Sequence, residues 1–325
     1  RFIDDLADFR VPVLLFSGGE PLLRPDFFEL AEHAAAKGVR PTLSTNGTLI
    51  DRATAQRIKD IGVGYVGISL DGLKDVNDKF RGKEGAYEAA MRGIENCTAV
   101  GQRVGLRFTI NHHNIMELDK IFDFIEEEGI NRVCFYHLVY SGRGNAMMEE
   151  DVTAQESRSA MDTIIRRTRD FEERGLEKEI LTVDNHCDGV YIYLKTLREK
   201  GEAAAEHVWK HISMNGGNRS GIAFGEVDPL GYVHPDQFTQ HHTFGNVRER
   251  KFGEIWQDTS NAIMAGLKDR KPLLTGRCSA CRYLSCCNGN FRTRAEARTG
   301  DFWASDPSCY LTDEEIGLVG EEAAI

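Results

Sequence analysis

The sequence contains no run of about 18 apolar residues, which is the length that a membrane-spanning helix requires. A secretory signal-peptide pattern is also absent. Basic residues are in the minority, with 40 Lys and Arg against 51 Asp and Glu, and the net charge of −11 disfavours nucleic acid as a partner. We therefore expect a cytoplasmic protein that neither spans a membrane nor binds nucleic acid.

Cysteine is scarce in most of the chain and concentrated near its end, where five of the eight cysteines lie between Cys278 and Cys309. In a long chain without a secretory signal, this clustering indicates metal binding rather than a disulfide framework. Four of them have the spacing Cys278-x2-Cys281-x5-Cys287-x21-Cys309. Four thiolates can bind one zinc ion or one 4Fe–4S cluster. A zinc ribbon usually has two Cys-x2-Cys hooks and this sequence has one, which modestly favours the cluster.

The other cysteines have different surroundings. Cys286 stands next to Cys287 and is expected to take no part in metal binding. Cys97 and Cys134 lie in apolar helix and strand patterns, which predict core positions. His186 and Cys187 belong to a polar cluster that could reach a substrate or a metal, or could simply begin a capped helix.

The first half of the chain alternates between short apolar runs and helical patterns. Five apolar runs predict buried strands, each followed by a helix or a glycine-rich turn, at residues 11–16, 39–45, 65–70, 104–110 and 132–139. Their spacing of about 25–30 residues indicates parallel strands with right-handed helical crossovers. Five units are too few for a closed eight-stranded barrel, so we expect an α/β fold with an open, partial barrel.

Small and polar residues follow these strands, at the edge where α/β sheets carry their ligand sites. The first strand leads to Gly18-Gly19-Glu20-Pro21, where two glycines let the backbone approach a ligand closely. Further along come Ser44-Thr45-Asn46-Gly47, Ser69-Leu70-Asp71-Gly72 and Arg107. One edge of the sheet is therefore predicted to bind a polar ligand.

Taken in order, these motifs resemble the radical S-adenosylmethionine (SAM) superfamily, and the resemblance covers essentially the whole chain. It implies a partial (βα)6 radical SAM barrel and places the methionine amino group of SAM at Gly18, Gly19, Glu20 and Pro21. The ribose and the carboxylate would face the strand ends that carry Ser44, Asn46, Ser69, Asp71 and Arg107. The chemistry agrees, because a zwitterionic amino acid needs an acceptor such as Glu20 and a donor such as Arg107.

One departure from the superfamily is large. Its cluster-binding loop, C-x3-C-x2-C, follows the first strand, and no such triad occurs in this sequence. Residues 1–10 look like the end of a helix with no strand before it. We therefore interpret the sequence as truncated, with the first βα unit absent and the SAM-binding 4Fe–4S cluster expected from the missing segment; natural loss of the triad is the alternative.

The C-terminal cysteines are similar to the auxiliary-cluster extension of many radical SAM enzymes. Its fuller version, called SPASM, has a cysteine after a Gly-x-Val-x-Pro hairpin turn and binds two clusters. Here Asp236 occupies that place, so we expect one auxiliary 4Fe–4S cluster, on Cys278, Cys281, Cys287 and Cys309. The predicted organisation is a barrel over 1–150, a helical connecting region over 151–220 and the small SPASM-like domain over 221–325, opening with a hairpin over 222–234.

A finer resemblance rests on His234-Pro235-Asp236-Gln237-Phe238, Phe244-Gly245-Asn246-Val247-Arg248, Cys287-Asn288-Gly289-Asn290-Phe291-Arg292 and Asn185-His186-Cys187-Asp188-Gly189. These segments look like the NirJ family of haem d1 biosynthesis. The resemblance implies an oxidoreductase or lyase that removes propionate side chains from the tetrapyrrole didecarboxysirohaem, leaving oxo groups. It also implies an electron donor of the ferredoxin or flavodoxin type.

Three other functions remain open. A sister family removes acetate groups in the alternative haem pathway, SPASM enzymes modify peptides, and a non-catalytic metal-binding scaffold would lack the triad naturally. For a tetrapyrrole, Arg143, Arg219 and Arg292 are candidates to bind carboxylates at an open rim, and His186 or His234 could ligate its iron. Residues 215–221 are expected to form a flexible loop, and the sequence singles out no acid or base.

Overall fold

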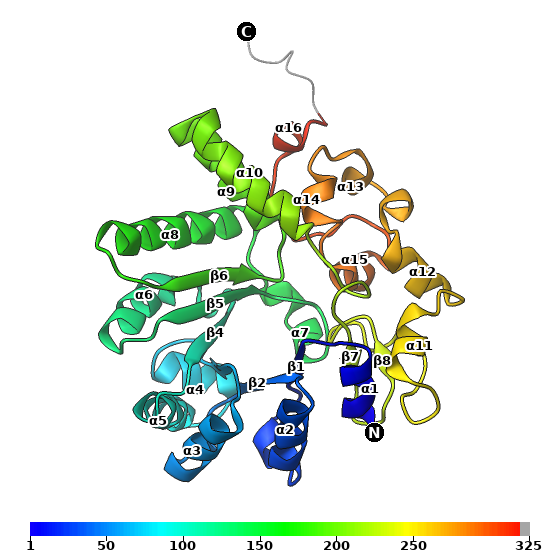
Figure 1. Cartoon of the computed structure of the whole chain (residues 1–325). Helices are drawn as coiled ribbons and strands as arrows, with labels where there is room; N and C mark the ends of the chain where they lie inside the picture. Colours follow the sequence, from blue (N-terminus) through cyan, green and yellow to red (C-terminus); the bar gives the residue numbers. More distant parts are fainter. Residues whose placement is uncertain (319–325) are drawn as a thin grey trace. The chain divides into compact units, whose positions relative to one another are not determined.

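The computed structural model describes residues 1–318, and the chain divides into two compact units (Figure 1). The first comprises residues 1–136, 166–181 and 251–253, and the second comprises residues 137–165, 182–250 and those from 254 onward. The predicted three-part division at 150 and 220 stays a prediction.

Six strands form one sheet and follow one another in chain order. They are β1 (Val13–Phe16), β2 (Arg40–Thr45), β3 (Val66–Ser69), β4 (Val104–Ile110), β5 (Arg132–His137) and β6 (Glu179–Val183). The β1–β2, β2–β3 and β3–β4 pairs are parallel. This arrangement confirms the predicted α/β fold and its five strands.

The sixth strand was not predicted, because it lies in a polar region expected to be helical. β6 joins the sheet through its first residues: the Glu179 backbone N–H donates to the Asn131 carbonyl at 2.7 Å. The Glu179 carboxylate also accepts from Arg132 at 2.5 Å and from Arg103. The strand itself, Glu-Ile-Leu-Thr-Val, is apolar and rich in β-branched residues, but it is only five residues long and lies within a region that is otherwise polar.

Helices α2 (Phe27–Ala36), α3 (Arg52–Ile61), α5 (Ala86–Ala99) and α6 (Leu118–Glu127) follow the first four strands. Figure 1 shows α2, α3 and α5 along the outer side of the curved sheet. Local chemistry sets their ends: the Asp51 side chain caps α3 by accepting from the Thr54 N–H at 2.7 Å, and Gly62 ends it at φ +82°. The first unit also contains α1 (Phe2–Asp8), η1 (Pro21–Leu23), α4 (Asp75–Arg81) and η2 (Ile115–Glu117).

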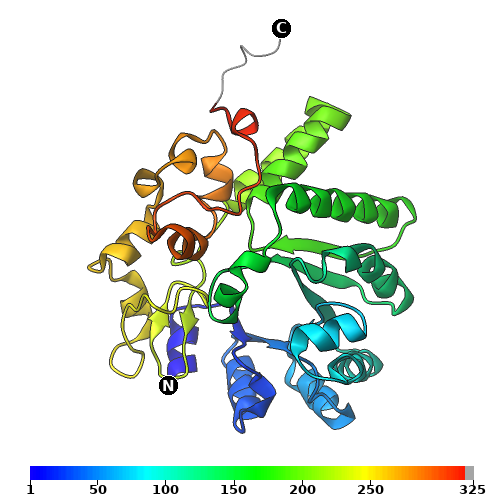
Figure 2. The same cartoon turned by 180° about the vertical axis from the view of Figure 1, so that it is seen from behind.

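The second unit consists mainly of short helices and turns, seen from behind in Figure 2. A two-stranded hairpin pairs β7 (Glu226–Val227) with β8 (Val233–His234), as predicted. The helices are α7 (Arg143–Ala146), η3 (Met148–Glu150), α8 (Ala154–Glu173, shared with the first unit), α9 (Cys187–Lys200), α10 (Glu202–Asn215), α11 (Phe252–Gln257, begun in the first unit), α12 (Ala262–Lys268), η4 (Lys271–Leu273), α13 (Arg277–Ala280), α14 (Leu284–Cys287), α15 (Arg292–Thr299) and α16 (Asp313–Ile316).

Two expectations about apolar segments can be checked against the structure. Cys97 and Cys134 are 0% and 5% exposed, which confirms their predicted core positions. Within residues 1–318, every helix is too short or too polar to cross a bilayer.

Candidate SAM site and iron–sulfur centre

The two faces of the sheet differ in polarity, and strand register decides which residues share a face. Ser44 pairs with Gly67, and Ser69 pairs with Arg107. Because side chains alternate along a strand, these four positions lie on one face. Ser44, Ser69 and Arg107 are partly exposed there, whereas the next residues along the strands, such as Leu43 and Ile68, are buried on the other face. The register thus brings three of the predicted SAM residues onto one polar face.

Arg107 crosses the neighbouring strand on that face. A Cβ atom at Gly67 would lie 2.9 Å from the Arg107 Cδ, so a larger residue at this position would displace the arginine. The guanidinium stacks over the Tyr136 ring, 4.3 Å from its centroid. Gly67 is therefore a supporting residue that the sequence analysis did not single out.

Glu20 connects the ends of the first two strands. Its carboxylate accepts from the Leu22 N–H at 3.1 Å, from the Thr45 hydroxyl at 2.7 Å and from the Asn46 N–H at 2.8 Å. An ionised carboxylate offers about four acceptor positions. Three are filled by the protein, and Glu20 is only partly buried, so one position remains for a donor from a ligand.

Asp71 is placed differently, since it is 1% exposed. Its carboxylate accepts from the Arg81 guanidinium and from the Thr109 N–H, the latter at 2.8 Å. Burial raises the pKa of the Asp71 carboxyl, although Arg81 opposes the shift. Through these contacts, Asp71 connects the end of β3 to β4 and to α4.

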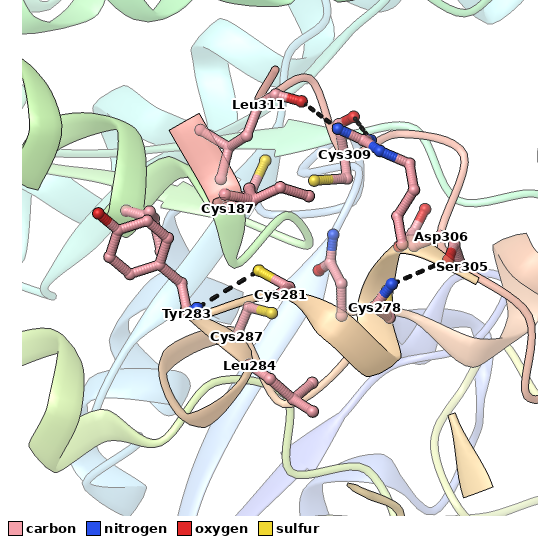
Figure 3. Close-up of a pocket in the computed structure, with 14 residues that line it drawn as sticks. Cys187, Cys278, Cys281, Tyr283, Leu284, Cys287, Ser305, Asp306, Cys309 and Leu311 are labelled. Carbon is pink, nitrogen blue, oxygen red and sulfur yellow. Dashed lines mark hydrogen bonds between the residues drawn. The ribbon is translucent and has the colours of Figure 1, made fainter. Parts of the chain in front are cut away.

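In the second unit, the four predicted cysteine ligands line one cavity (Figure 3). Cys278, Cys281 and Cys287 come from α13, α14 and the segment between them, and Cys309 comes from the segment before α16. A fifth cysteine, Cys187 at the start of α9, lines the same cavity and is 2% exposed. Cys286 is absent from the lining, and its sulfur instead lies 4.0 Å from the Ser213 hydroxyl.

Three of these sulfurs accept a hydrogen bond from the backbone N–H two residues later. Cys281 accepts from Tyr283 at 3.4 Å. Cys287 and Cys309 accept in the same way from Gly289 and Leu311. Residues 288–290 all have positive φ, between 52° and 75°, which wraps the backbone around the Cys287 sulfur. Such N–H donors stabilise thiolate, the form of cysteine that binds metals.

The distances between the sulfurs distinguish zinc from a cluster. Zn–S bonds of about 2.3 Å in a tetrahedron place the sulfurs about 3.8 Å apart. Within residues 1–318, no three cysteine sulfurs lie within 4.8 Å of one another; only His241, His242 and Glu296 form so tight a group of possible ligands, with both imidazoles sharing the carboxylate. A four-iron cube spaces its thiolates more widely, because each binds a different iron, so the cysteines that line the cavity are compatible with a cluster.

Arginines offset the negative charge that a thiolate-bound cluster would bring into this cavity. Arg277, Arg292 and Arg270 each interact electrostatically with one or two of the ligand cysteines. Arg270 is 1% exposed, and burial lowers its pKa to about 10. A buried cation is costly without a counter-charge; Asp236 supplies part of it, and the thiolates of a bound cluster would supply more. Of the two neighbouring thiols, Cys187 lowers the pKa of Cys309, while burial raises the pKa of Cys187.

A packed loop supports the Cys287 turn, which corrects the expectation that residues 215–221 are flexible. Asn218 is 1% exposed, donates its backbone N–H to the Cys287 carbonyl at 3.1 Å and accepts from Arg270 at 2.9 Å. At Gly217, where φ is +71°, a Cβ atom would lie 2.2 Å from the Cys287 carbonyl carbon. The loop approaches the turn this closely only because it has glycine there.

The residues proposed to bind a tetrapyrrole differ in exposure, and only two of the three arginines are exposed. Arg292 is 3% exposed and donates to the carbonyls of Gly289, Phe302 and Ala304, so its expected place at an open rim is wrong. Arg143 and Arg219 are exposed.

His234, one of the two histidines considered as iron ligands, is buried, and its Nδ1 is hydrogen-bonded to the His242 carbonyl at 3.0 Å. His186 stacks on the Phe291 ring, and burial lowers its pKa to about 4. The Asp236 carboxylate accepts hydrogen bonds from the backbone N–H groups of Phe238 and Thr239 and from the Thr239 hydroxyl, so Asp236 stabilises the turn that it begins.

Comparison with known proteins identifies the family. Residues 1–125 match the radical SAM superfamily, and residues 224–282 match an iron–sulfur cluster-binding domain, SPASM. The chain is 58% identical over 318 residues to Fe-coproporphyrin III synthase of Methanosarcina barkeri, covering 97% of the chain and 79% of the relative. The chain belongs to the radical SAM superfamily. This radical SAM enzyme is also 43% identical to pre-heme d1 synthase of Dinoroseobacter shibae, over 97% of the chain and 78% of the relative.

Solved structures agree on the fold. The structure of anSMEcpe with bound AdoMet and Cp18Cys peptide matches with a TM-score of 0.71 at 17% identity, over 95% of this chain and 84% of that one. SuiB of Streptococcus suis, bound to its precursor peptide, matches with a TM-score of 0.73 at 16% identity, over 96% and 70%. These similarities confirm the predicted radical SAM fold with a C-terminal SPASM domain.

Proposed function

We propose that this radical SAM enzyme acts on didecarboxysirohaem and removes its acetate groups to form Fe-coproporphyrin III. The observation that carries the proposal is the 58% identity, over nearly the whole chain, to the enzyme named for that product. Removal of propionate side chains in haem d1 formation, the function that the sequence motifs suggested first, is the second candidate and rests on 43% identity.

SAM and a reduced 4Fe–4S cluster would supply the radical that abstracts hydrogen from the substrate. The residues of the chain would hold SAM at the polar edge of the sheet. The free acceptor position of Glu20 suits the methionine ammonium, and Arg107 suits the carboxylate. Gly18, Gly19 and Pro21 would shape the approach to Glu20, and Ser44, Asn46 and Ser69 would bond the ribose, while Asp71 would fix the end of β3.

The thiol cavity would hold the auxiliary cluster through Cys278, Cys281, Cys287 and Cys309. The donor spacing, the N–H···S bonds and the surrounding arginines support this assignment. Four thiolates leave no open iron position, so an electron-transfer role fits better than substrate binding at the cluster. Both reactions would also require an external electron donor of the ferredoxin or flavodoxin type.

The two haem reactions can be separated by their products. The full-length enzyme would be incubated anaerobically with didecarboxysirohaem, SAM and a reductant, and the products identified by mass spectrometry. We expect Fe-coproporphyrin III, and none without SAM. A product with oxo groups in place of propionates would establish the haem d1 reaction instead. Absence of both products, with SAM cleavage stimulated only by a peptide, would refute the tetrapyrrole proposal.

A further inference from the structure

The cavity contains one thiol more than a cluster requires. Four thiolates complete a 4Fe–4S cube, yet Cys187 lines the same cavity as the four predicted ligands and is 2% exposed. A buried cysteine that serves only for packing would need no sulfur neighbour. Cys187 instead lines the cavity together with Cys309, and Figure 3 shows the two sulfurs next to each other.

The residues that follow the two cysteines are bonded to each other, so the sulfur pair is held in place. The Tyr310 hydroxyl donates to Asp188 at 2.6 Å, and both residues are buried. The other Asp188 oxygen lies 3.0 Å from the His137 Nε2. Each contact is enclosed, where a polar group that lost its partner would be costly. Cys187 and Cys309 therefore cannot move apart without breaking this network.

A second set of bonds fixes the start of α9. The Asn290 side chain donates to the Asn185 amide oxygen at 2.6 Å and accepts from the His186 backbone N–H at 2.9 Å. Asn290 lies three residues after Cys287, in the turn that wraps around that sulfur. The first turn of α9 is thus attached both to the Cys287 turn and, through Asp188, to the residue after Cys309.

The direction of a hydrogen bond between the two sulfurs follows from the chemistry of a ligand. A cysteine bound to iron is a thiolate and has no proton to donate. If Cys309 is the ligand, Cys187 is the one of the two neighbouring sulfurs that can donate a proton. A hydrogen bond to a cluster sulfur stabilises the more negative, reduced state more than the oxidised one, and such bonds help to set the reduction potential.

We infer that Cys187 is a positioning residue of the auxiliary-cluster site, which donates its S–H to the Cys309 thiolate and thereby raises the cluster's reduction potential. This inference rests on the proposed cluster in the cavity. The cavity then has two classes of thiol, four that bind iron and one that adjusts the potential at which the cluster exchanges an electron.

The test compares single variants of the 325-residue chain after anaerobic reconstitution with iron and sulfide. Cys187→Ala removes the donor, Cys187→Ser keeps an O–H donor, and Cys286→Ala is the matched control at another buried cysteine outside the cavity. Iron content, the electron paramagnetic resonance spectrum and the midpoint potential from a redox titration would be measured for each.

We expect wild-type iron content in all three variants. The midpoint potential should become more negative in Cys187→Ala, move much less in Cys187→Ser and stay unchanged in Cys286→Ala. An unchanged potential in Cys187→Ala would overturn the inference, as would loss of iron in that variant combined with retention in Cys309→Ala, because Cys187 would then be the ligand. A wild-type chain that takes up no iron would contradict the underlying cluster proposal, and this inference with it.

Discussion

The polar edge of the sheet and the thiol cavity are built by different means. At the sheet edge, parallel pairing brings Ser44, Ser69 and Arg107 onto one face without any special contact between them. The cavity is not built on a regular hydrogen-bonded sheet. Its ligands come from short helices and turns, and bonds such as the Arg294–Asp306 ion pair hold those segments together.

This difference determines how each site would tolerate change. A regular sheet fixes its edge through many backbone bonds, so one substitution there should alter binding more than folding. An irregular site depends on a few buried contacts, so one substitution should loosen the segments that carry the ligands. The predictions below compare the two regions, starting with the largest expected effect.

The largest effect should come from the Arg294–Asp306 pair beside the cavity, in which both side chains are 0% exposed. Arg294→Met leaves the Asp306 carboxylate buried without its cation, which should cost about 3–5 kcal/mol of unfolding free energy. The control is Arg298→Met on the same helix, whose ion pair with Glu149 is exposed and should contribute little to stability. Urea unfolding measures both, and equal losses would contradict this account of the cavity.

Two adjacent glycines offer a test of close packing at the Cys287 turn. Gly216 and Gly217 have φ values of +69° and +71°, but only at Gly217 would a Cβ meet the Cys287 backbone. Gly216→Ala should cost about 1–2 kcal/mol from backbone strain alone. Gly217→Ala adds overpacking, for a total of about 2–5 kcal/mol. Thermal unfolding and iron retention should separate them, whereas identical behaviour would show that the loop does not support the turn.

At the sheet edge, Glu20→Ala should weaken SAM binding by about 1.5–3 kcal/mol, because it removes a charged acceptor from the proposed ammonium site. Titration calorimetry with the full-length enzyme measures the affinity. The control is Glu29→Ala on α2, an exposed glutamate of the same unit. If Glu20→Ala left the SAM affinity unchanged, Glu20 would not belong to the binding site.

The smallest effect concerns pH and the second unit. Arg158 donates to both oxygens of Glu315 at 2.8 Å, and these hydrogen bonds lower the pKa of Glu315 to about 2. Because the folded-state value lies below the usual one, the stabilisation is complete above about pH 4.5 and is lost as the pH falls toward 2.

Glu315→Gln should therefore reduce the unfolding free energy by about 1.5 kcal/mol at pH 7 and by progressively less below pH 4.5. Unfolding curves across this pH range, with the exposed neighbour Glu314→Gln as control, measure the difference. A deficit that did not shrink in acid would mean that the charge of Glu315 is not responsible.

The sequence predicted more of the first unit than of the second. Alternating apolar runs and strand-end motifs foretold five strands and a polar edge, since local patterns and parallel pairing suffice to place them. Two features escaped prediction. One is β6, a short apolar run inside a polar region, and the other is Gly67, whose role depends on a side chain from the neighbouring strand.

In the second unit, cysteine spacing predicted the four thiols that meet in the cavity, but their surroundings could not be derived from local sequence. The sequence left open whether Cys187 reaches a substrate or metal or only begins a capped helix. It lies 91 residues before Cys278 along the chain, and long-range contacts bring it to the cavity. The prediction that Arg292 lies at an open rim was wrong, because the exposure of a side chain cannot be inferred from its charge alone. The positive φ angles of residues 288–290 did have a signal, the Asn-Gly-Asn sequence.

The central claim is that the cavity binds one 4Fe–4S cluster through Cys278, Cys281, Cys287 and Cys309. Its most direct test is the metal content and visible absorption of the 325-residue chain after anaerobic reconstitution. We expect about four irons per chain in the wild type and in Cys286→Ser, and loss of that iron in Cys281→Ser. Zinc in place of iron without charge-transfer absorption, or undiminished iron in Cys281→Ser, would contradict the claim.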